Sequence, residues 1–422
     1  MTDPILLVRA AVALIAVATI VAAFARRISL PDSVVLVVAG LVGATVFPDL
    51  ALAVTPGLVL GVFIPGLVFA AAYSIDWADL RPVLGPIVAL AIPGVLASAV
   101  VVAYALYLVV GLPLELAFVV GAITAATDPV AVVAAMRRLE VPRGLRTIVE
   151  GESLLNDGTG LVLFALAVRG VERGVGTAEA AVLFAGTIAV STVVGIAGGF
   201  IAARLVRATD DRTIQLGISL VTAYGTYQVA DAIGLSGILA TVIAGIALGS
   251  RMRRTAGSDL LVREVEDLWE VVAFILTSLV LLLIGFAIRP PAIAAASAAV
   301  AVGTGAVVAA RALIVYVPAM AVRLWNPARA VPPGWTHVIF WSGLRGAIAL
   351  AAALSLPTDF PGRELIQQVS LGVVLVTLLV QGAGAPTVVR RALRGGPSPT
   401  ALRSAAGVGA PDGVGAPKVR PH

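Results

Sequence analysis

The sequence predicts an all-α membrane protein that crosses the bilayer many times. Of its 422 residues, 59% are hydrophobic and only 13% are charged, and the mean hydropathy is +1.04. Soluble domains carry about 25% charged and 45–50% apolar residues, so this composition excludes a soluble globular domain and a disordered chain. The chain has no cysteine, which also excludes a small secreted domain held together by disulfides.

Thirteen apolar stretches qualify as membrane spans, because a span needs about 20 mostly apolar residues. We expect them at about 5–24, 30–47, 52–73, 84–110, 114–136, 147–168, 180–203, 213–230, 234–249, 268–288, 292–321, 336–356 and 365–389. The first is interpreted as a retained helix rather than a signal peptide, because its basic flank follows the apolar run. Residues 1–391 therefore form the membrane domain, and residues 392–422, rich in Gly, Pro, Ser and Ala, are expected to be a disordered cytoplasmic tail.

The basic residues support this count, because they concentrate in the cytoplasmic loops of membrane proteins. With the N-terminus outside, 22 of the 29 basic residues fall on the inside. The other seven fall outside (Arg169, Arg173, Arg289 and Arg363) or within spans (Arg9, Arg311 and Arg345). We therefore expect a cell (plasma or inner) membrane protein with its C-terminus in the cytoplasm. The net charge of +5 reflects this topology and does not indicate nucleic-acid binding.

Four charged residues lie deep inside predicted spans, where each charge costs about 2.5–3.5 kcal/mol. They are Asp128, Glu152, Asp157 and Arg345. At about 1.5 Å of rise per residue, three of them lie ~12–15 Å from the cytoplasmic end of their spans. That depth is near the middle of a hydrocarbon core about 30 Å thick, where transporters bind their substrates. The sequence therefore predicts a transport site there.

Two of these spans are also expected to be interrupted. Pro129 follows Asp128 directly and removes a helical hydrogen bond, and Gly343 and Gly346 flank Arg345. Broken helices at this depth are tolerated where they line a cavity, so spans 5 and 12 are expected to form a crossed pair of interrupted helices. A simpler structural role stays open for two of the charges: Asp128 as a helix cap, and Glu152 as the neutralising partner of Arg345.

Three short stretches carry a resemblance to a known family. Residues 127–129 read Thr-Asp-Pro, residues 151–158 read Gly-Glu-Ser-Leu-Leu-Asn-Asp-Gly, and residues 341–348 read Trp-Ser-Gly-Leu-Arg-Gly-Ala-Ile. They resemble the TDP, GESLLND and GLRGA motifs of the monovalent cation:proton antiporters of the NhaP/NHE type. Residues 235–240 and 282–285 also fit the patterns of that family, so the resemblance extends in order from span 3 to span 13.

The resemblance implies a sodium/proton antiporter in which Asp157 alternately binds the cation and the proton. It implies further Na⁺ ligands: Asp128, Ser153 and the backbone of Thr127. It also implies a supporting set: Asn156, Glu152 and Arg345, with the last two paired. No cofactor is expected besides the transported Na⁺ and H⁺, and the Asn at position 156 is associated in the family with electroneutral one-for-one exchange.

The resemblance also implies a fold of thirteen helices with inverted six-helix repeats, assembled as a homodimer. A dimerisation part would contain spans 1–3 and 7–10 (about 5–73 and 180–288), with span 7 linking the halves. A moving core would contain spans 4–6 and 11–13 (about 84–168 and 292–389). The sequence departs from the family at Ala70, where many members carry an acidic residue, and this leaves the choice of cation open.

Several alternatives remain at this stage. K⁺/H⁺ exchange by the same fold is the nearest, because of Ala70. A channel is less consistent, because we find neither a carbonyl filter nor a ring of charges. An enzyme needs an activated nucleophile, but the only histidines, His337 and His422, lie far along the chain from Ser153. No role is assigned to Arg311, and His337 is expected to be an ordinary interfacial residue or a pH sensor.

Close helix packing is expected where glycines recur four residues apart. Three such pairs are Gly57 with Gly61, Gly195 with Gly199, and Gly245 with Gly249.

Overall fold

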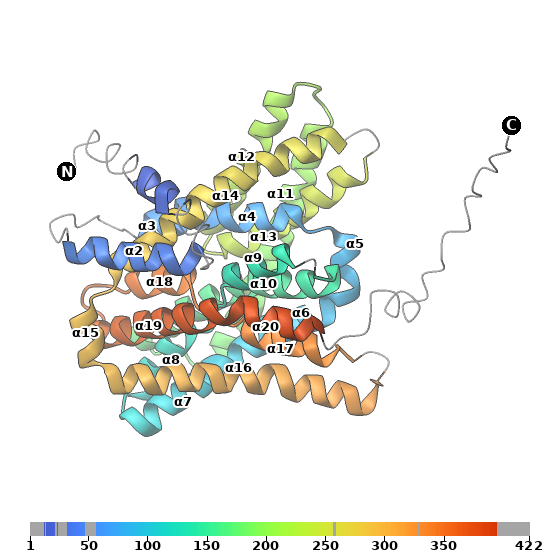
Figure 1. The fold of residues 1–422 in the computed structure, drawn as a ribbon. Coiled ribbons are helices and arrows are strands. Elements are labelled where there is room, and N and C mark those ends of the chain that lie inside the picture. The colour runs from blue at the N-terminus through green and yellow to red at the C-terminus, as the bar shows by residue number, and fades with distance from the viewer. Residues whose placement is uncertain are drawn as a thin grey trace, which may run out of the picture.

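The computed structural model describes residues 12–23 (except 13 and 22), 32–46, 56–139, 141–255, 259–327 and 330–394. Throughout these residues the regular secondary structure is helical, and they contain no β-strand (Figure 1). Arg9, His422 and residues 395–422 of the predicted tail lie outside the described part. The all-α class predicted from the composition is confirmed for the described chain.

The helices follow the predicted spans in order. The first half contains α2 (Asp32–Val46), α3 (Pro56–Leu58), η1 (Val59–Phe63), α4 (Ile64–Ser74), α5 (Trp77–Leu80), η2 (Arg81–Val83), α6 (Leu84–Ala89), η3 (Leu90–Gly94), α7 (Val95–Ala105), η4 (Leu106–Val110), α8 (Leu114–Ile123), α9 (Val130–Arg138) and α10 (Arg143–Arg173). The second half contains α11 (Thr177–Val206), α12 (Arg212–Ala232), α13 (Gly237–Arg253), α14 (Asp259–Ala287), α15 (Pro290–Ala295), α16 (Ser297–Trp325), α17 (Pro333–Trp341), α18 (Ala347–Leu354), α19 (Arg363–Thr377), η6 (Leu378–Gly382) and α20 (Ala383–Arg394).

Six helical stretches in the described chain are long and apolar enough to cross a membrane, judged by length and composition. They are 77–110, 143–173, 177–206, 260–287, 297–325 and 363–392. The full number of thirteen crossings stays a prediction. Large apolar side chains remain on the surface of several of these helices, such as Val182 and Val193 of α11, 72% and 64% exposed. A lipid environment accounts for such exposure, because hydrocarbon is as favourable to these groups as a protein core.

Two helices are interrupted at the positions where the sequence predicts a break. In the first, α8 ends at Ile123 and α9 begins at Val130, directly after Pro129. In the second, α17 ends at Trp341 and α18 begins at Ala347, directly after Gly346. Proline supplies no backbone N–H and disfavours helical geometry at the preceding residue, which explains the first break.

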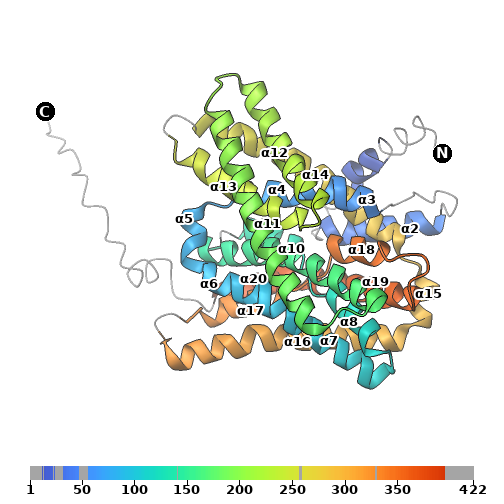
Figure 2. The same cartoon turned by 180° about the vertical axis from the view of Figure 1, so that it is seen from behind.

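The helices form an upper and a lower group in the views of Figures 1 and 2. Helices α12, α13 and α14 occupy the upper part, α7, α8, α16, α17 and α20 occupy the lower part, α11 runs from the upper part down toward the lower one, and α10 lies between the two groups. α16 packs along α19 and α17, whereas α13 packs against α11, α12 and α4. α10 contacts members of both groups, including α13 and α8.

Glycines bring several helix backbones into close contact. A Cβ atom at Gly195 or Gly199 of α11 would overlap the backbone carbonyl of Ala240 or Ala244 of α13. Gly245 and Gly249 of α13 lie in the same way against α4. Two of the three predicted glycine pairs therefore pack helices, as the four-residue spacing indicates. At Gly57 and Gly61 a Cβ atom would have no neighbour within 4 Å among the described residues.

One close helix contact coincides with a stretch that fits the family pattern, residues 282–285, and it joins α2 and α14. Gly285 belongs to the 282–285 stretch, and a Cβ atom there would overlap the carbonyl oxygen of Val37 and come within 2.8 Å of the Cα atom of Gly40. This pattern in the sequence therefore reflects a close backbone approach rather than ion chemistry.

We predict that Gly285→Ala lowers thermal stability in detergent, because overpacking a tight contact costs about 1–3 kcal/mol. The matched control is Gly305→Ala in α16, where a Cβ atom would have no neighbour within 4 Å. There the better helix propensity of alanine, about 1 kcal/mol, should leave stability equal or higher. Equal melting temperatures for the two variants would contradict the packing argument.

Candidate ion-binding site between two interrupted helices

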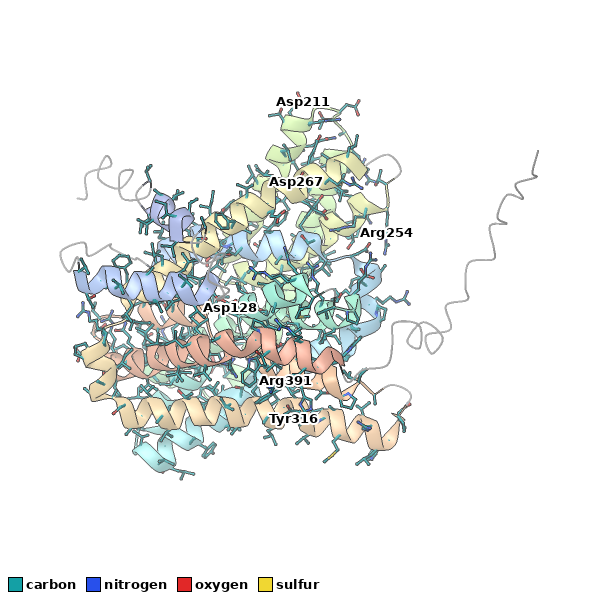
Figure 3. The ribbon with its side chains drawn as sticks, in the orientation of Figure 1. Asp128, Asp211, Arg254, Asp267, Tyr316 and Arg391 are labelled. Atoms are coloured by element: carbon teal, nitrogen blue, oxygen red, sulfur yellow. The ribbon has the colours of Figure 1, made fainter. Side chains whose placement is uncertain are left out.

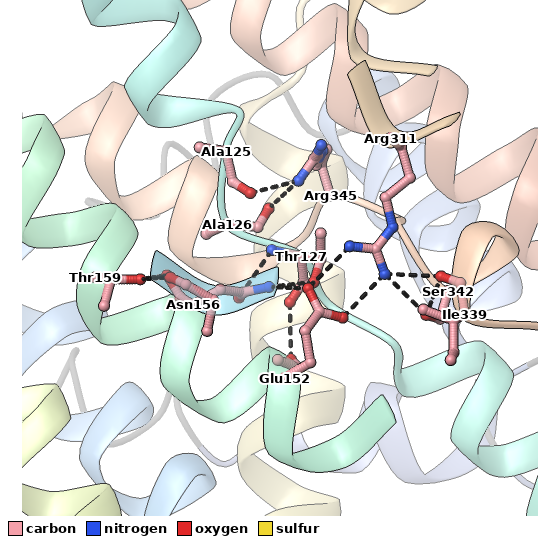
Figure 4. A network of polar contacts seen from close by, with 12 residues as sticks. Ala125, Ala126, Thr127, Glu152, Asn156, Thr159, Arg311, Ile339, Ser342 and Arg345 are labelled. Carbon is pink, nitrogen blue, oxygen red and sulfur yellow. Dashed lines mark hydrogen bonds and ion pairs between the residues drawn. The ribbon is translucent and has the colours of Figure 1, made fainter. Parts of the chain in front are cut away.

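The two helix interruptions contact each other. The backbone N–H of Asp128 in the first break donates to the carbonyl oxygen of Leu344 in the second, at 2.8 Å. The Nη1 atom of Arg345 donates to the carbonyl oxygens of Ala125 and Ala126 at 2.6 and 2.9 Å (Figure 4). Arg345 is 1% exposed, and the two carbonyl oxygens that it bonds lie in the first break, just beyond the end of α8.

Asp128 lies at the N-terminal ends of two helices. Its Oδ1 atom accepts from the N–H of Val130, the first residue of α9, at 3.2 Å. Its Oδ2 atom accepts from the N–H of Ala347, the first residue of α18, at 3.4 Å. Helix N-termini carry partial positive charge, so one carboxylate compensates both ends. The contacts therefore show the capping role that was one alternative for Asp128.

Gly346 and Gly343 make room for charged side chains from other helices. A Cβ atom at Gly346 would overlap the carboxylate of Asp128. A Cβ atom at Gly343 would lie 2.9 Å from Cγ and Nε of Arg311. The glycines of the second break are thus required for space, in addition to interrupting the helix.

Glu152 forms an ion pair with Arg311 and not, as the sequence analysis expected, with Arg345. The Nη1 and Nη2 atoms of Arg311 donate to Oε1 and Oε2 of Glu152, both at 2.9 Å, and each side chain is 2% exposed. Nη2 also donates to the carbonyl oxygen of Ile339 at 2.7 Å, near the end of α17. The Arg345 guanidinium donates to the carbonyl oxygens of Ala125 and Ala126, just beyond α8, and the Glu152 carboxylate pairs with Arg311 instead.

Asn156 and Thr127 connect this ion pair to the first break. Asn156 Nδ2 donates to Glu152 Oε1 at 2.7 Å and to Thr127 Oγ1 at 2.6 Å, and its Oδ1 atom accepts from the Thr127 N–H at 3.2 Å. Ser153 Oγ donates to the Thr127 carbonyl oxygen at 2.8 Å. The predicted support by Asn156 is therefore visible as three hydrogen bonds, all buried.

A cavity of about 950 Å³ reaches these residues. Its wall includes Asp157, Asp128, Ser153 and Thr127, together with Ala70 of α4. The charged residues farther along its wall are Arg137, Arg138, Arg146, Arg390, Glu150, Glu266 and Glu270. Asp128 projects to the middle of the molecule in Figure 3, whereas Asp211 lies at its edge.

Asp157 is the exception among the deep charges. Within the described residues, no group donates a hydrogen bond to its carboxylate and no cation pairs with it, and the residue is partly exposed to the cavity. Asp128, Asp157 and Ser153 thus all line the same cavity, and oxygen atoms are the ligands that small hard cations prefer.

The comparisons with known proteins decide the family. The family model described as "Sodium/hydrogen exchanger, transmembrane" matches residues 13–391. The chain belongs to this sodium/hydrogen exchanger family. The resemblance stated from the three motifs is therefore confirmed.

Named members of the exchanger family are similar along most of this chain. The Na(+)/H(+) antiporter ApNhaP of Aphanothece halophytica is 36% identical over 332 residues, 77% of this chain and 62% of that protein. The Na(+)/H(+) antiporter NhaP of Pseudomonas aeruginosa is 34% identical, covering 78% of this chain and 80% of the relative. The chain thus spans less than two thirds of the Aphanothece protein and four fifths of the Pseudomonas one.

A solved exchanger structure shares the fold. The sodium proton antiporter MjNhaP1 from Methanocaldococcus jannaschii at pH 8 superposes with a TM-score of 0.74, covering 92% of this chain and 98% of the other. The sequence identity is 17%, so this likeness concerns the fold alone.

Sequence reasoning missed Arg311. The same argument that singled out Arg345 applies to it, since it lies inside a predicted span and is 2% exposed in the structure. His337 hydrogen-bonds through Nδ1 to the hydroxyl of Tyr316 at 2.8 Å and is itself exposed, which fits an interfacial residue.

We predict that Glu152→Gln strongly destabilises the protein, because breaking a buried ion pair costs about 3–5 kcal/mol. The control is Glu150→Gln in the same helix, whose pair with Arg146 at 2.8 Å is partly exposed and worth about 0–1 kcal/mol. Melting temperatures in detergent measure both effects. If the two variants melt alike, Arg311 does not depend on Glu152 for its charge compensation.

Proposed function

We propose that this protein exchanges Na⁺ or Li⁺ for H⁺ across the cell membrane, with both ions competing for Asp157. The observation that carries the proposal is the state of that carboxylate: it faces a cavity, beside ligand oxygens of Asp128 and Ser153, and has no protein partner among the described residues. The names of the antiporter relatives support the choice of ions.

The coupling follows from competition at one group. Burial away from water favours the neutral, protonated form of a carboxyl group, and a bound cation neutralises the same group in another way. If the carboxylate crosses the membrane only when neutralised, each cation moved in one direction requires a proton moved in the other. No cofactor takes part, because Na⁺ and H⁺ are themselves the substrates.

The walls of the cavity support alternating access between two parts of the chain. The cavity lining contains residues of α4 and α14, in the proposed dimerisation part, together with residues of α9, α10, α18 and α20, in the proposed core. Movement of the core against the dimerisation part would expose the fixed site to each side in turn. The crossed helices, the inverted repeats and the homodimer belong to this proposal.

The charges of the cavity support an opening to the cytoplasm. Arg137, Arg138, Arg146 and Arg390 line it, and the topology derived from the basic residues assigns all four to the inside. The N-terminus outside and the C-terminus inside belong to the same proposal.

One-for-one exchange is supported by the hydrogen bonds around Asp157. The neighbouring Asn156 is neutral, and the Glu152 carboxylate is neutralised by Arg311. Asp128 is held by two helix N-termini. A single unpartnered carboxylate then carries either one monovalent cation or one proton per cycle. The names of the relatives give no support to K⁺/H⁺ exchange, and they denote transporters rather than enzymes.

We predict that Asp157→Ala abolishes Na⁺-dependent proton movement in everted membrane vesicles, because the shared binding group is lost. Asp267→Ala, which removes an exposed carboxylate from α14, is the control and should leave transport intact. Membrane insertion of both variants is checked by their yield after extraction. Persistent Na⁺-driven alkalinisation by Asp157→Ala would reject the assigned role.

A second prediction concerns stoichiometry and cation. In proteoliposomes, the rate of Na⁺/H⁺ exchange should not change when a membrane potential is imposed with K⁺ and valinomycin, because equal charges move in both directions. Na⁺ and Li⁺ should drive exchange, and K⁺ should not. A clear dependence on the potential would reject one-for-one exchange, and exchange driven by K⁺ as well as by Na⁺ would reject the proposed selectivity.

A further inference from the structure

Thr159 makes a hydrogen bond that neither the resemblance nor the proposed ion site accounts for. It lies two residues after Asp157 on α10 and is 1% exposed. Its hydroxyl donates to the backbone carbonyl oxygen of Ala91 at 2.5 Å, and lies 3.3 Å from that of Asn156 (Figure 4). The contact joins predicted spans 4 and 6 beside the candidate site.

The acceptor lies in an irregular turn. Residues Leu90–Gly94 form the π-helical segment η3, which contains Pro93. A proline inside a helix removes one backbone donor, and a π-turn shifts the register of the remaining ones, so carbonyl groups there need other partners. Ala91 is fully buried, and the Thr159 hydroxyl gives its carbonyl oxygen a side-chain donor from a neighbouring helix.

The residues on both sides of Thr159 fix the same turn by close packing. A Cβ atom at Gly158 would lie 2.9 Å from Cβ of Leu239 on α13, and one at Gly160 would lie 3.1 Å from Cβ of Ala126 in the first break. Three successive residues thus face α13, η3 and the first break. Among these contacts only the one from Thr159 has a preferred direction, since it is a hydrogen bond.

We propose that Thr159 is a positioning residue for cation binding: its bond to Ala91 sets the rotation of the α10 turn that presents Asp157 to the cavity. The inference rests on the proposed function. A cation needs several oxygen atoms at fixed distances, whereas a proton needs one oxygen atom only. Loss of the bond therefore weakens the binding of the cation and leaves the binding of the proton nearly unchanged.

The test compares Thr159→Val, which keeps the shape and removes the hydroxyl, with Thr159→Ser, which keeps the hydroxyl. Thr192→Val in α11 is the matched control, because its hydroxyl bonds only within its own helix, to Ile188 at 2.8 Å. The Na⁺ concentration dependence is measured twice: as the KM of exchange in proteoliposomes, and as the Na⁺-dependent rise in melting temperature of the detergent-purified protein. The pH dependence of exchange is measured at several Na⁺ concentrations. Extrapolation of the apparent pKa to zero Na⁺ then gives the constant for proton binding alone.

We expect Thr159→Val to raise two quantities roughly three- to tenfold: the KM for Na⁺ in exchange, and the Na⁺ concentration that gives the half-maximal rise in melting temperature. This is the range for losing one neutral hydrogen bond. The extrapolated proton constant should change less than twofold, and Thr159→Ser and Thr192→Val should resemble the unmodified protein. An unchanged Na⁺ constant, a loss of maximal rate alone, or equal shifts for cation and proton would overturn the proposal. If the unmodified protein binds Na⁺ without exchanging it, the proposed function fails, and the melting measurement still decides the role of Thr159.

Discussion

The structure depends on charged side chains that compensate the partial charges of four helix ends, which meet deep inside the protein. Each interrupted helix leaves one end with free carbonyl groups and one with free N–H groups, and these groups need partners inside the protein. Arg345 bonds the carbonyl oxygens of Ala125 and Ala126 just beyond α8, Arg311 bonds that of Ile339 near the end of α17, and Asp128 accepts from the N-termini of both α9 and α18. The central charges thus keep the breaks stable before any ion is bound.

This compensation distinguishes the deep charges that have protein partners from Asp157. Glu152 is held by Arg311 and Asn156, and Asn156 is held in turn by Thr127. Asp157 lies one residue beyond Asn156 on the same helix, yet none of the described residues binds its carboxylate. The network therefore fixes the backbone around Asp157 while leaving its oxygen atoms available to the cavity.

The sequence predicted the all-α class and the apolar helices long enough to cross a membrane, because apolar length is a strong local signal. It also predicted both breaks, because Pro129 and the glycines around Arg345 act on their own backbone. The partner of Glu152 was predicted wrongly, since two arginines lie inside spans and the choice between them depends on tertiary placement. The bond from Thr159 to Ala91 was not predictable, because a π-helical turn leaves no clear pattern in a single sequence.

The lack of space beside Gly346 limits which substitutions the chain tolerates. A side chain at 346 would occupy the volume of the Asp128 carboxylate, which comes from another helix more than 200 positions earlier. A larger residue at 346 is therefore compatible only with a shorter residue at 128, and that change would leave two helix ends without an anion. A substitution at either position therefore requires a compensating change at the other, and the same holds for Gly343 with Arg311. Motifs far apart in this sequence thus constrain one another through the volume of their side chains as much as through their charges.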